Sequence, residues 1–291
     1  MQFMELLDNS PGMTFTVFLV LGLLIGSFVN VVTYRLPIML DRQWQIETRH
    51  FLGLLGDPRN AEGRPFNLIR PWSHCPNCKR RIRPWEMIPV FSYVLLLGKC
   101  AGCRQRIPLR YPLVELACGL LAGLLVLIYG VGWLTLALLV FCYALFALAV
   151  IDAENQLLPD ILTLPLLWLG LLLNALSPDL LGTGAADAII GAAAAYILLG
   201  GFHYTYRVLT GKEGMAQGDF KLLAAMCAWL GWIALPFIVL ISSVTGAIWG
   251  LTLVTIHGRS WLQPLAFGPF LVFAGFTVLL IGPERMAGWL G

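Results

Sequence analysis

Charged residues are scarce in this sequence: Asp, Glu, Lys and Arg make up 12% of its 291 residues, whereas 58% are hydrophobic. A typical soluble domain carries about twice that share of charge, roughly 25%. The shortage excludes a soluble globular protein. Apolar stretches of about 20 residues, which is the length needed to cross a bilayer, recur along the chain, so we expect an integral membrane protein.

Two further absences narrow the interpretation. Met1 to Met13 contains no Lys or Arg, so the first apolar stretch lacks the basic region that precedes the core of a secretory signal peptide. We expect this stretch to be retained as a membrane helix. The sequence also has no glycine-rich fingerprint of a dinucleotide-binding fold, so no cofactor pocket of that kind is predicted.

The apolar stretches predict an all-α polytopic membrane protein with about eight transmembrane helices. A count of seven is the alternative, because only Gly231-Trp232 separates two of the stretches. The expected helices lie near residues 14–34, 112–129, 133–151, 158–176, 186–206, 219–231, 233–256 and 265–282. The predicted division of the chain is a first membrane helix (1–35), a cysteine-rich domain (36–111) and a multi-helix membrane domain (112–291).

Positive charge is concentrated in one part of the chain, because 14 of the 19 Lys and Arg lie from Arg35 to Arg110. Basic loops beside apolar spans are typical of the cytoplasmic side of a membrane. This explanation is simpler than nucleic-acid binding, so we expect no nucleic-acid partner, and the excess charge favours contact with anionic lipids. The N-terminus is then periplasmic, and Asp152 and Asp219 both lie at the cytoplasmic boundary.

Four cysteines in the basic segment form two Cys-x-x-Cys pairs, Cys75 with Cys78 and Cys100 with Cys103, separated by 21 residues. This spacing is typical of a structural zinc site with four thiolate ligands. The alternative is a pair of transient disulfides. His74, next to Cys75, is a candidate to replace one of the thiolates as a zinc ligand. Four neighbouring cations are expected to offset the charge of a zinc tetrathiolate: Lys79, Arg80, Arg81 and Lys99.

Asp152 and Asp219 each stand at the edge of an apolar stretch. Acids in such places are costly and usually functional. Two neighbouring carboxylates share a proton, so one can activate water while the other protonates a leaving amine. Gly218, beside Asp219, permits close approach of a substrate backbone. The alternatives are a solvated interfacial acid and a proton or ion relay, and the residues alone favour a protease and a transporter equally.

Other acids lie near the same boundary. We expect Asp160 to cap a helix that follows Pro159, and Glu154 to lie in a solvated loop. Glu213 is a further acid that is expected at this boundary. Lys221 is expected to pair with an acid or to extend to the membrane interface.

Several separate stretches resemble type IV prepilin peptidases. The matching stretches are Gly26–Pro37, the paired Cys-x-x-Cys motifs, Arg110–Glu115, Asp152 with Leu157–Asp160, and Gly214–Lys221. Their order and spacing agree over nearly the whole chain. One departure is Ala216, which replaces the first glycine of the family's Gly-x-Gly-Asp signature.

The resemblance implies a multi-pass enzyme of the bacterial inner membrane with its cysteine domain and active site facing the cytoplasm. Such enzymes cut the basic leader from prepilins and pseudopilins after a glycine, and then methylate the new N-terminal residue with S-adenosylmethionine. The proteolytic pair carries over to Asp152 and Asp219. The methyl-donor region carries over to Glu86 and Gly98. The alternative functions are an ion- or proton-coupled transporter with a regulatory zinc domain, and a scaffold that binds pilins without cutting them.

Overall fold

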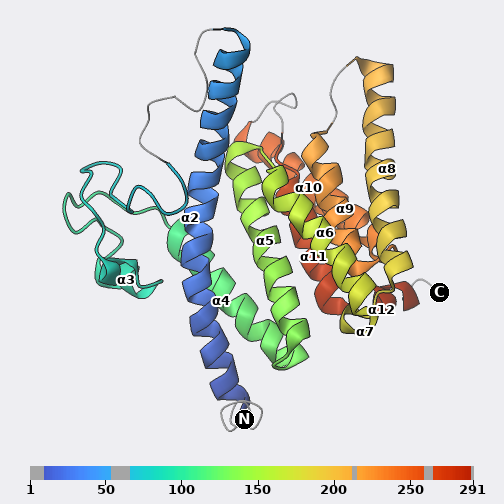
Figure 1. The fold of residues 1–291 in the computed structure, drawn as a ribbon, viewed down its shortest axis with the longest axis horizontal. Helices are drawn as coiled ribbons and strands as arrows, with labels where there is room; N and C mark the ends of the chain where they lie inside the picture. The colour runs from blue at the N-terminus through green and yellow to red at the C-terminus, as the bar shows by residue number, and fades with distance from the viewer. Residues whose placement is uncertain (1–9, 54–65, 212–214, 259–264, 290–291) are drawn as a thin grey trace. The chain divides into compact units, whose positions relative to one another are not determined.

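The computed structural model describes residues 10–53, 66–211, 215–258 and 265–289. Across these ranges the chain is mostly helical and forms no β-strand. The helices are α2 (Pro11–Phe51), η2 (Pro84–Met87), α3 (Phe91–Leu95), α4 (Arg110–Tyr129), α5 (Trp133–Asn155), α6 (Asp160–Leu176), α7 (Pro178–Leu181), α8 (Ala185–Thr210), α9 (Gln217–Leu230), α10 (Ala234–His257), α11 (Gly268–Ile281) and α12 (Pro283–Gly288) (Figure 1).

Five described helices, α2, α4, α5, α8 and α10, are long and apolar enough to cross a membrane. They support the expected membrane protein. Two of the other expected spans, α6 and α11, are shorter apolar helices, and α9 has only 14 residues. The count of eight spans therefore stays a prediction.

The chain divides into two compact units, Met1–Leu139 and Val140–Gly291. The first contains α2, the cysteine-rich segment and α4. The second contains most of α5 and all helices from α6 onward. The predicted three-part division, with boundaries at 35/36 and 111/112, stays a prediction.

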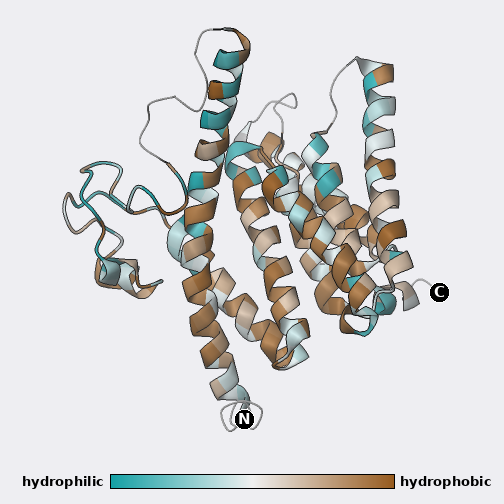
Figure 2. Cartoon of the chain, viewed as in Figure 1, coloured by the Kyte–Doolittle hydropathy of each residue, from teal (hydrophilic) through white to brown (hydrophobic). Residues whose placement is uncertain are grey.

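Helix α2 is much longer than the expected helix near residues 14–34. It runs for 41 residues through Pro37, or about 60 Å at roughly 1.5 Å per residue, about twice the thickness of a hydrocarbon core. Figure 2 shows hydrophobic residues along its first half and hydrophilic residues towards its C-terminal end. The end expected for this helix, near residue 34, was therefore wrong, because a polar helix continues directly from the apolar one.

Arg35 in α2 binds the backbone of a segment that lies beyond the end of this helix. Its side chain is buried, and its guanidinium donates to the carbonyl oxygens of Asn67 at 2.9 Å and Pro71 at 2.7 Å. A buried arginine needs such partners. Arg35, which belongs to the Gly26–Pro37 stretch, therefore holds the backbone from Asn67 to Pro71, just before the first cysteine pair, against α2.

Helices α2 and α4 approach each other closely through small residues. A methyl group added at Gly26 would lie 2.7 Å from Cα of Glu115, and Gly119 of α4 is packed against Leu23. Small residues on both helices therefore permit this close approach, as is common between membrane helices. Glu115 also accepts a hydrogen bond from the Val90 backbone N–H at 2.8 Å, which attaches the α3 turn to α4.

Helix α9 forms the core of the second unit. Every residue from Leu222 to Trp229 is almost completely buried. Trp229 donates from Nε1 to the Leu166 carbonyl at 2.8 Å and stacks on Phe141, while Asn174 donates to the Ala228 carbonyl at 2.9 Å. These bonds satisfy polar groups in an apolar interior and fix α9 against α6.

Candidate functional site

The four cysteines predicted as metal ligands converge. The Sγ atoms of Cys75, Cys78, Cys100 and Cys103 all lie within 4.8 Å of one another, and those of Cys75 and Cys103 are 3.8 Å apart. A tetrahedral zinc site with bonds of about 2.3 Å has edges of about 3.8 Å. Four thiols at this spacing therefore fit a tetrahedral metal ion.

The two cysteine pairs share one backbone arrangement. In the first, the Lys79 N–H donates to the Cys75 carbonyl at 2.9 Å, and in the second the Arg104 N–H donates to the Cys100 carbonyl at 3.0 Å. Lys79 and Arg104 both have positive φ, 57° and 60°, which is uncommon for residues other than glycine. An isolated antiparallel bridge closes each turn. The sequence therefore folds into two equivalent half-sites.

Hydrogen bonds favour the thiolate form at two of the ligands. The backbone N–H of Gln105 and the side-chain amide of Asn77 lower the pKa of Cys103 to about 6. The backbone N–H groups of Cys103 and Gly102 lower the pKa of Cys100. Metal binding requires deprotonated sulfur, so these donors favour occupancy by a cation. Hydrogen-bond donors around a metal site commonly orient the ligands in this way.

The cations predicted to balance the cluster have different roles. Arg80 interacts electrostatically with Cys100 and pairs with Glu86 at 2.6 Å. Arg81 instead lies over the Trp72 ring, 3.9 Å from its centroid. His74 is exposed, with Nδ1 3.0 Å from the Trp72 carbonyl, and it is not among the clustered ligands.

Glu86 and Gly98, the residues predicted near the methyl donor, both have structural partners. Glu86 accepts hydrogen bonds from Arg80 and from the Arg83 backbone, and these two donors lower its pKa, the Arg83 N–H most strongly. Gly98 has φ of 66°, and an added Cβ would lie 2.7 Å from the Tyr93 hydroxyl. These contacts do not test binding of S-adenosylmethionine, so the predicted methyl-donor role of the two residues stays a prediction.

The second candidate site is the pair of aspartates in the helical unit. Asp152 lies in the last turn of α5 and Asp219 in the first turn of α9. Each is only 5% exposed, and the charge of Asp152 acts on the carboxyl group of Asp219. Buried carboxylates are expensive without specific partners, so the arrangement is typical of a functional site.

Gly268 is a site residue that the sequence analysis missed. Its backbone N–H donates to Oδ2 of Asp152 at 2.8 Å across 116 residues of sequence. A Cβ at this position would lie only 2.7 Å from the same oxygen. The local signal was Gly-Pro at the start of an apolar stretch, but such a pair is common at helix starts and gives no indication of a distant carboxylate.

The residues before Asp219 explain its position. A Cβ at Gly218 would lie 2.7 Å from Cβ of Leu158, so this glycine permits close packing against the segment that follows α5. Ala216 is the N-cap of α9 with φ of −74° and ψ of 144°. This is ordinary extended backbone, so replacing the usual glycine by alanine costs no strain at this position.

The other described acids near this boundary, Glu154 and Asp160, are exposed. Asp160 stands in the first turn of α6, but Pro159 is the N-cap and no side chain caps this helix, so the expected capping role was wrong. The oxygens of Asp160 instead bind Nζ of Lys221 at 2.7 and 2.8 Å. Glu154 is exposed in the last turn of α5 and not in a loop. Glu213 lies outside the described residues. Asp152 and Asp219 are therefore the two buried acids of the described helical unit.

This geometry permits acid–base chemistry without a metal ligand set. Two interacting carboxyl groups in a desolvated place hold one proton between them more readily than two charges. One oxygen can then take a proton from water while the other carboxyl group donates its proton. Asp152 and Asp219 therefore meet the chemical requirements of an aspartic peptidase.

Comparisons with known proteins cover both units. Residues 20–129 match the model of the bacterial peptidase A24 N-terminal domain, and residues 139–251 match the type IV leader peptidase family. The chain is 46% identical to prepilin leader peptidase/N-methyltransferases from Stutzerimonas stutzeri and Aeromonas hydrophila, over 98% of this chain and 97% of each relative. The relative of that name from Neisseria gonorrhoeae is 46% identical over 93% of this chain and 92% of its own. No solved structure matches the chain.

Proposed function

This chain belongs to the type IV leader peptidase family, and we propose from that membership that it removes leader peptides from type IV prepilins and pseudopilins and then methylates the new N-terminus. It is an enzyme of the kind its relatives are named for, a prepilin leader peptidase and N-methyltransferase. The transporter alternative has no support among these relatives.

The observation that carries the peptidase half of the proposal is that Asp152, at the end of α5, and Asp219, at the start of α9, are both buried. One carboxylate removes a proton from a water molecule, whose oxygen attacks the carbonyl carbon of the scissile peptide. The other, protonated carboxyl group then donates its proton to the departing amide nitrogen as the C–N bond breaks. The Gly268 N–H orients the Asp152 oxygen that it binds.

The cysteine cluster supports a structural zinc ion as the second part of the proposal. Cys75, Cys78, Cys100 and Cys103 would hold the ion, and four thiolates leave no open position for catalysis. The ion would instead order a segment that has little hydrophobic core of its own.

S-adenosylmethionine would supply an electrophilic methyl group for the second reaction. By resemblance we place that reaction in the region of Glu86 and Gly98. The amine released by proteolysis is the methyl acceptor, so the order of reactions is fixed: the leader must leave before methylation.

The proposed location is the bacterial inner membrane, with the N-terminus periplasmic and the cysteine-rich segment and aspartates facing the cytoplasm. The support is the concentration of 14 Lys and Arg between Arg35 and Arg110, which favours the cytoplasmic side. The family resemblance implies that the prepilin leader is basic, so it would stay on the cytoplasmic side, and cleavage after a glycine would occur at this boundary. Membrane lipids would be further partners of the enzyme.

The experiment is mass spectrometry of a purified prepilin incubated with the enzyme in lipid, with and without S-adenosylmethionine. We expect a product cut after glycine in both cases, and an increase of one methyl mass only with the donor. Asp152→Asn and Asp219→Asn should each reduce cleavage by at least about a thousandfold, because an amide cannot act as base or acid.

Asp160→Asn is the matched control, because this acid pairs with Lys221 on the surface. This variant should cut prepilin at close to the wild-type rate. Full cleavage by either Asp152→Asn or Asp219→Asn would refute the proposed pair. Prepilin left intact by the wild type under all conditions would refute the peptidase proposal itself.

A further inference from the structure

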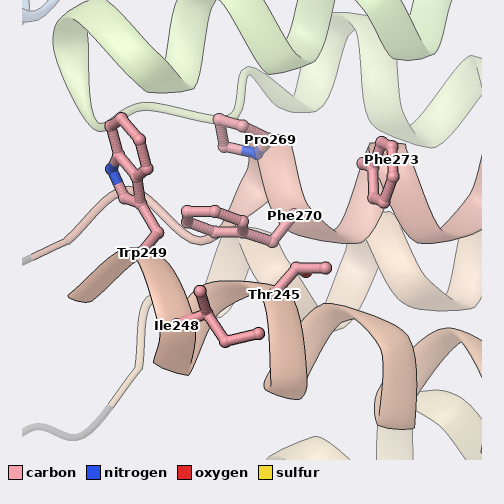
Figure 3. Close-up of a pocket in the computed structure, with 6 residues that line it drawn as sticks. All are labelled: Thr245, Ile248, Trp249, Pro269, Phe270 and Phe273. Carbon is pink, nitrogen blue, oxygen red and sulfur yellow. The ribbon is translucent and has the colours of Figure 1, made fainter. Parts of the chain in front are cut away.

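An open apolar groove lies between α10 and α11. Six side chains line it: Thr245, Ile248, Trp249, Pro269, Phe270 and Phe273. Its volume is about 380 Å³. Figure 3 shows Trp249 and Phe273 at opposite ends of the groove, with Phe270 between them.

The lining of the groove is apolar apart from the hydroxyl group of Thr245, and that hydroxyl group is already hydrogen-bonded. The hydroxyl of Thr245 donates within α10, to the Ile241 carbonyl at 2.7 Å, so the groove offers no free polar group at that residue. Ile248, Trp249 and Phe273 are each more than half exposed. Because α10 is long and apolar enough to span a membrane, the occupant of this groove must be apolar too.

One side of the groove lies next to a residue that binds Asp152. Pro269 lines it, and the preceding residue, Gly268, donates its N–H to Asp152. From Pro269 to Phe273 the groove follows α11 for about one helical turn, roughly 6 Å. An apolar segment lying along this turn would enter the site at the level of the Asp152 oxygen.

A transmembrane helix is a better occupant than lipid on physical grounds. Apolar helices gain nothing from leaving water when both are already in a bilayer, so their association depends on close packing. A hollow lined by rigid aromatic rings gives a partner helix fixed contacts, in the manner of a helix laid into a groove. A mobile acyl chain would have to give up more freedom to make the same contacts.

We propose that this groove is the docking site for the apolar helix of the prepilin, the segment that follows the scissile bond. Trp249, Phe270 and Phe273 anchor one turn of that helix and hold the substrate in the bilayer next to the site. This inference rests on the proposed function, which supplies a substrate with an apolar helix next to the cleavage point. The groove therefore acts in substrate binding and not in bond cleavage.

The first test measures cleavage kinetics in lipid vesicles. Trp249→Ala and Phe273→Ala should each raise KM for prepilin about tenfold, as expected for the loss of an aromatic anchor, with kcat nearly unchanged. Trp168→Ala is the matched control, because Trp168 is a similarly exposed tryptophan that does not line the groove. A KM equal to the wild type in both groove variants would overturn the proposal.

The second test maps the occupant directly. A photo-reactive phenylalanine placed at Ile248 should cross-link to the apolar helix of prepilin, whereas one at Leu251, an exposed position of α10 outside the groove, should not. Cross-links from position 248 to lipid alone would overturn the inference. If the wild type never cuts prepilin but position 248 still captures the intact substrate, the peptidase proposal fails while the docking site stands.

Discussion

The cysteine cluster and the aspartate pair differ in how the chain holds them. The four clustered cysteines stand on short turns, and three of them retain solvent exposure, whereas both aspartates are 95% buried among close-packed helices. In the first region, local backbone hydrogen bonds fix the side chains. In the second, contacts between helices distant in sequence do so, as in the bond from Gly268 to Asp152.

This difference shows where each region is vulnerable. A small segment with little apolar core depends on its cross-link, so the cysteine-rich region should fail when its ligands are removed. A packed helical site tolerates the loss of single surface groups but not added volume, because buried cores have no room for it.

The largest effect should follow removal of one half-site. Cys75→Ser/Cys78→Ser should lose about one bound zinc per chain, since two ligands cannot complete a tetrahedral shell. By our proposal methylation is then lost, while cleavage by the aspartates persists. Metal analysis and the mass-spectrometric assay check both expectations.

His74→Ala is the control for this variant, because its ring lies outside the cluster and metal content should not change. Zinc retained in full by the double serine variant would contradict the tetrathiolate site. Equal loss of cleavage and methylation in this variant would contradict the expectation that the aspartate pair works without the cysteine cluster.

A second prediction adds a single methyl group to the helical site. Gly268→Ala would place Cβ 2.7 Å from Oδ2 of Asp152, so the carboxylate or the start of α11 must move. A displacement of about 1 Å at a catalytic group can cost roughly a hundredfold in rate. We expect cleavage to fall about 10- to 100-fold, with zinc content unchanged.

The control for this methyl group is Gly201→Ala on α8, where an added Cβ meets no atom within 4 Å. Its cleavage rate should equal that of the wild type. Wild-type kinetics in Gly268→Ala would show that this contact does not position Asp152.

A smaller effect is expected at the edge of the cysteine-rich region. Hydrogen bonds from the Arg83 backbone and Arg80 lower the pKa of Glu86, so its contribution to stability is present above the ordinary glutamate pKa, about 4.3. That contribution is lost as pH falls through the lowered value. Glu86→Gln should therefore lower the thermal midpoint slightly at neutral pH and have no effect in stronger acid. A pH-independent difference would contradict this assignment.

The smallest effect should come from restoring the usual family glycine at position 216. Ala216 already has φ of −74°, so Ala216→Gly relieves no strain and alters the helix cap by well under about 1 kcal/mol. Cleavage rate and thermal midpoint should both match the wild type. A marked increase in rate would show that this position needs a conformation that alanine does not adopt.

Much of this arrangement follows from local sequence. Composition predicts the membrane protein, and the Cys-x-x-Cys spacing predicts the metal cluster, because both signals lie within short stretches. The sequence also identifies Asp152 and Asp219, since a lone acid beside an apolar stretch is conspicuous. Their expected role as the proteolytic pair remains to be tested by the substitutions above.

The parts that the sequence left undetermined depend on contacts between distant segments. Nothing near Gly268 points to a carboxylate 116 residues earlier, because the bond arises only when α11 packs beside the end of α5. Likewise, the end expected for the first helix followed the apolar residues, whereas α2 continues through Pro37 as a polar helix. Hydropathy marks where a membrane span ends and not where a helix ends.

The shared fold of the two cysteine turns bears on how a metal ion would be captured and released. Each turn closes on itself through its own backbone bonds, from Lys79 to Cys75 and from Arg104 to Cys100, so two ligands are arranged on either side before an ion joins them. Only the 21-residue loop between them must then be closed, and the entropy cost of closure rises slowly with length. Such an ion would work as a removable cross-link, one that a chelator would withdraw and added zinc would restore without refolding either turn.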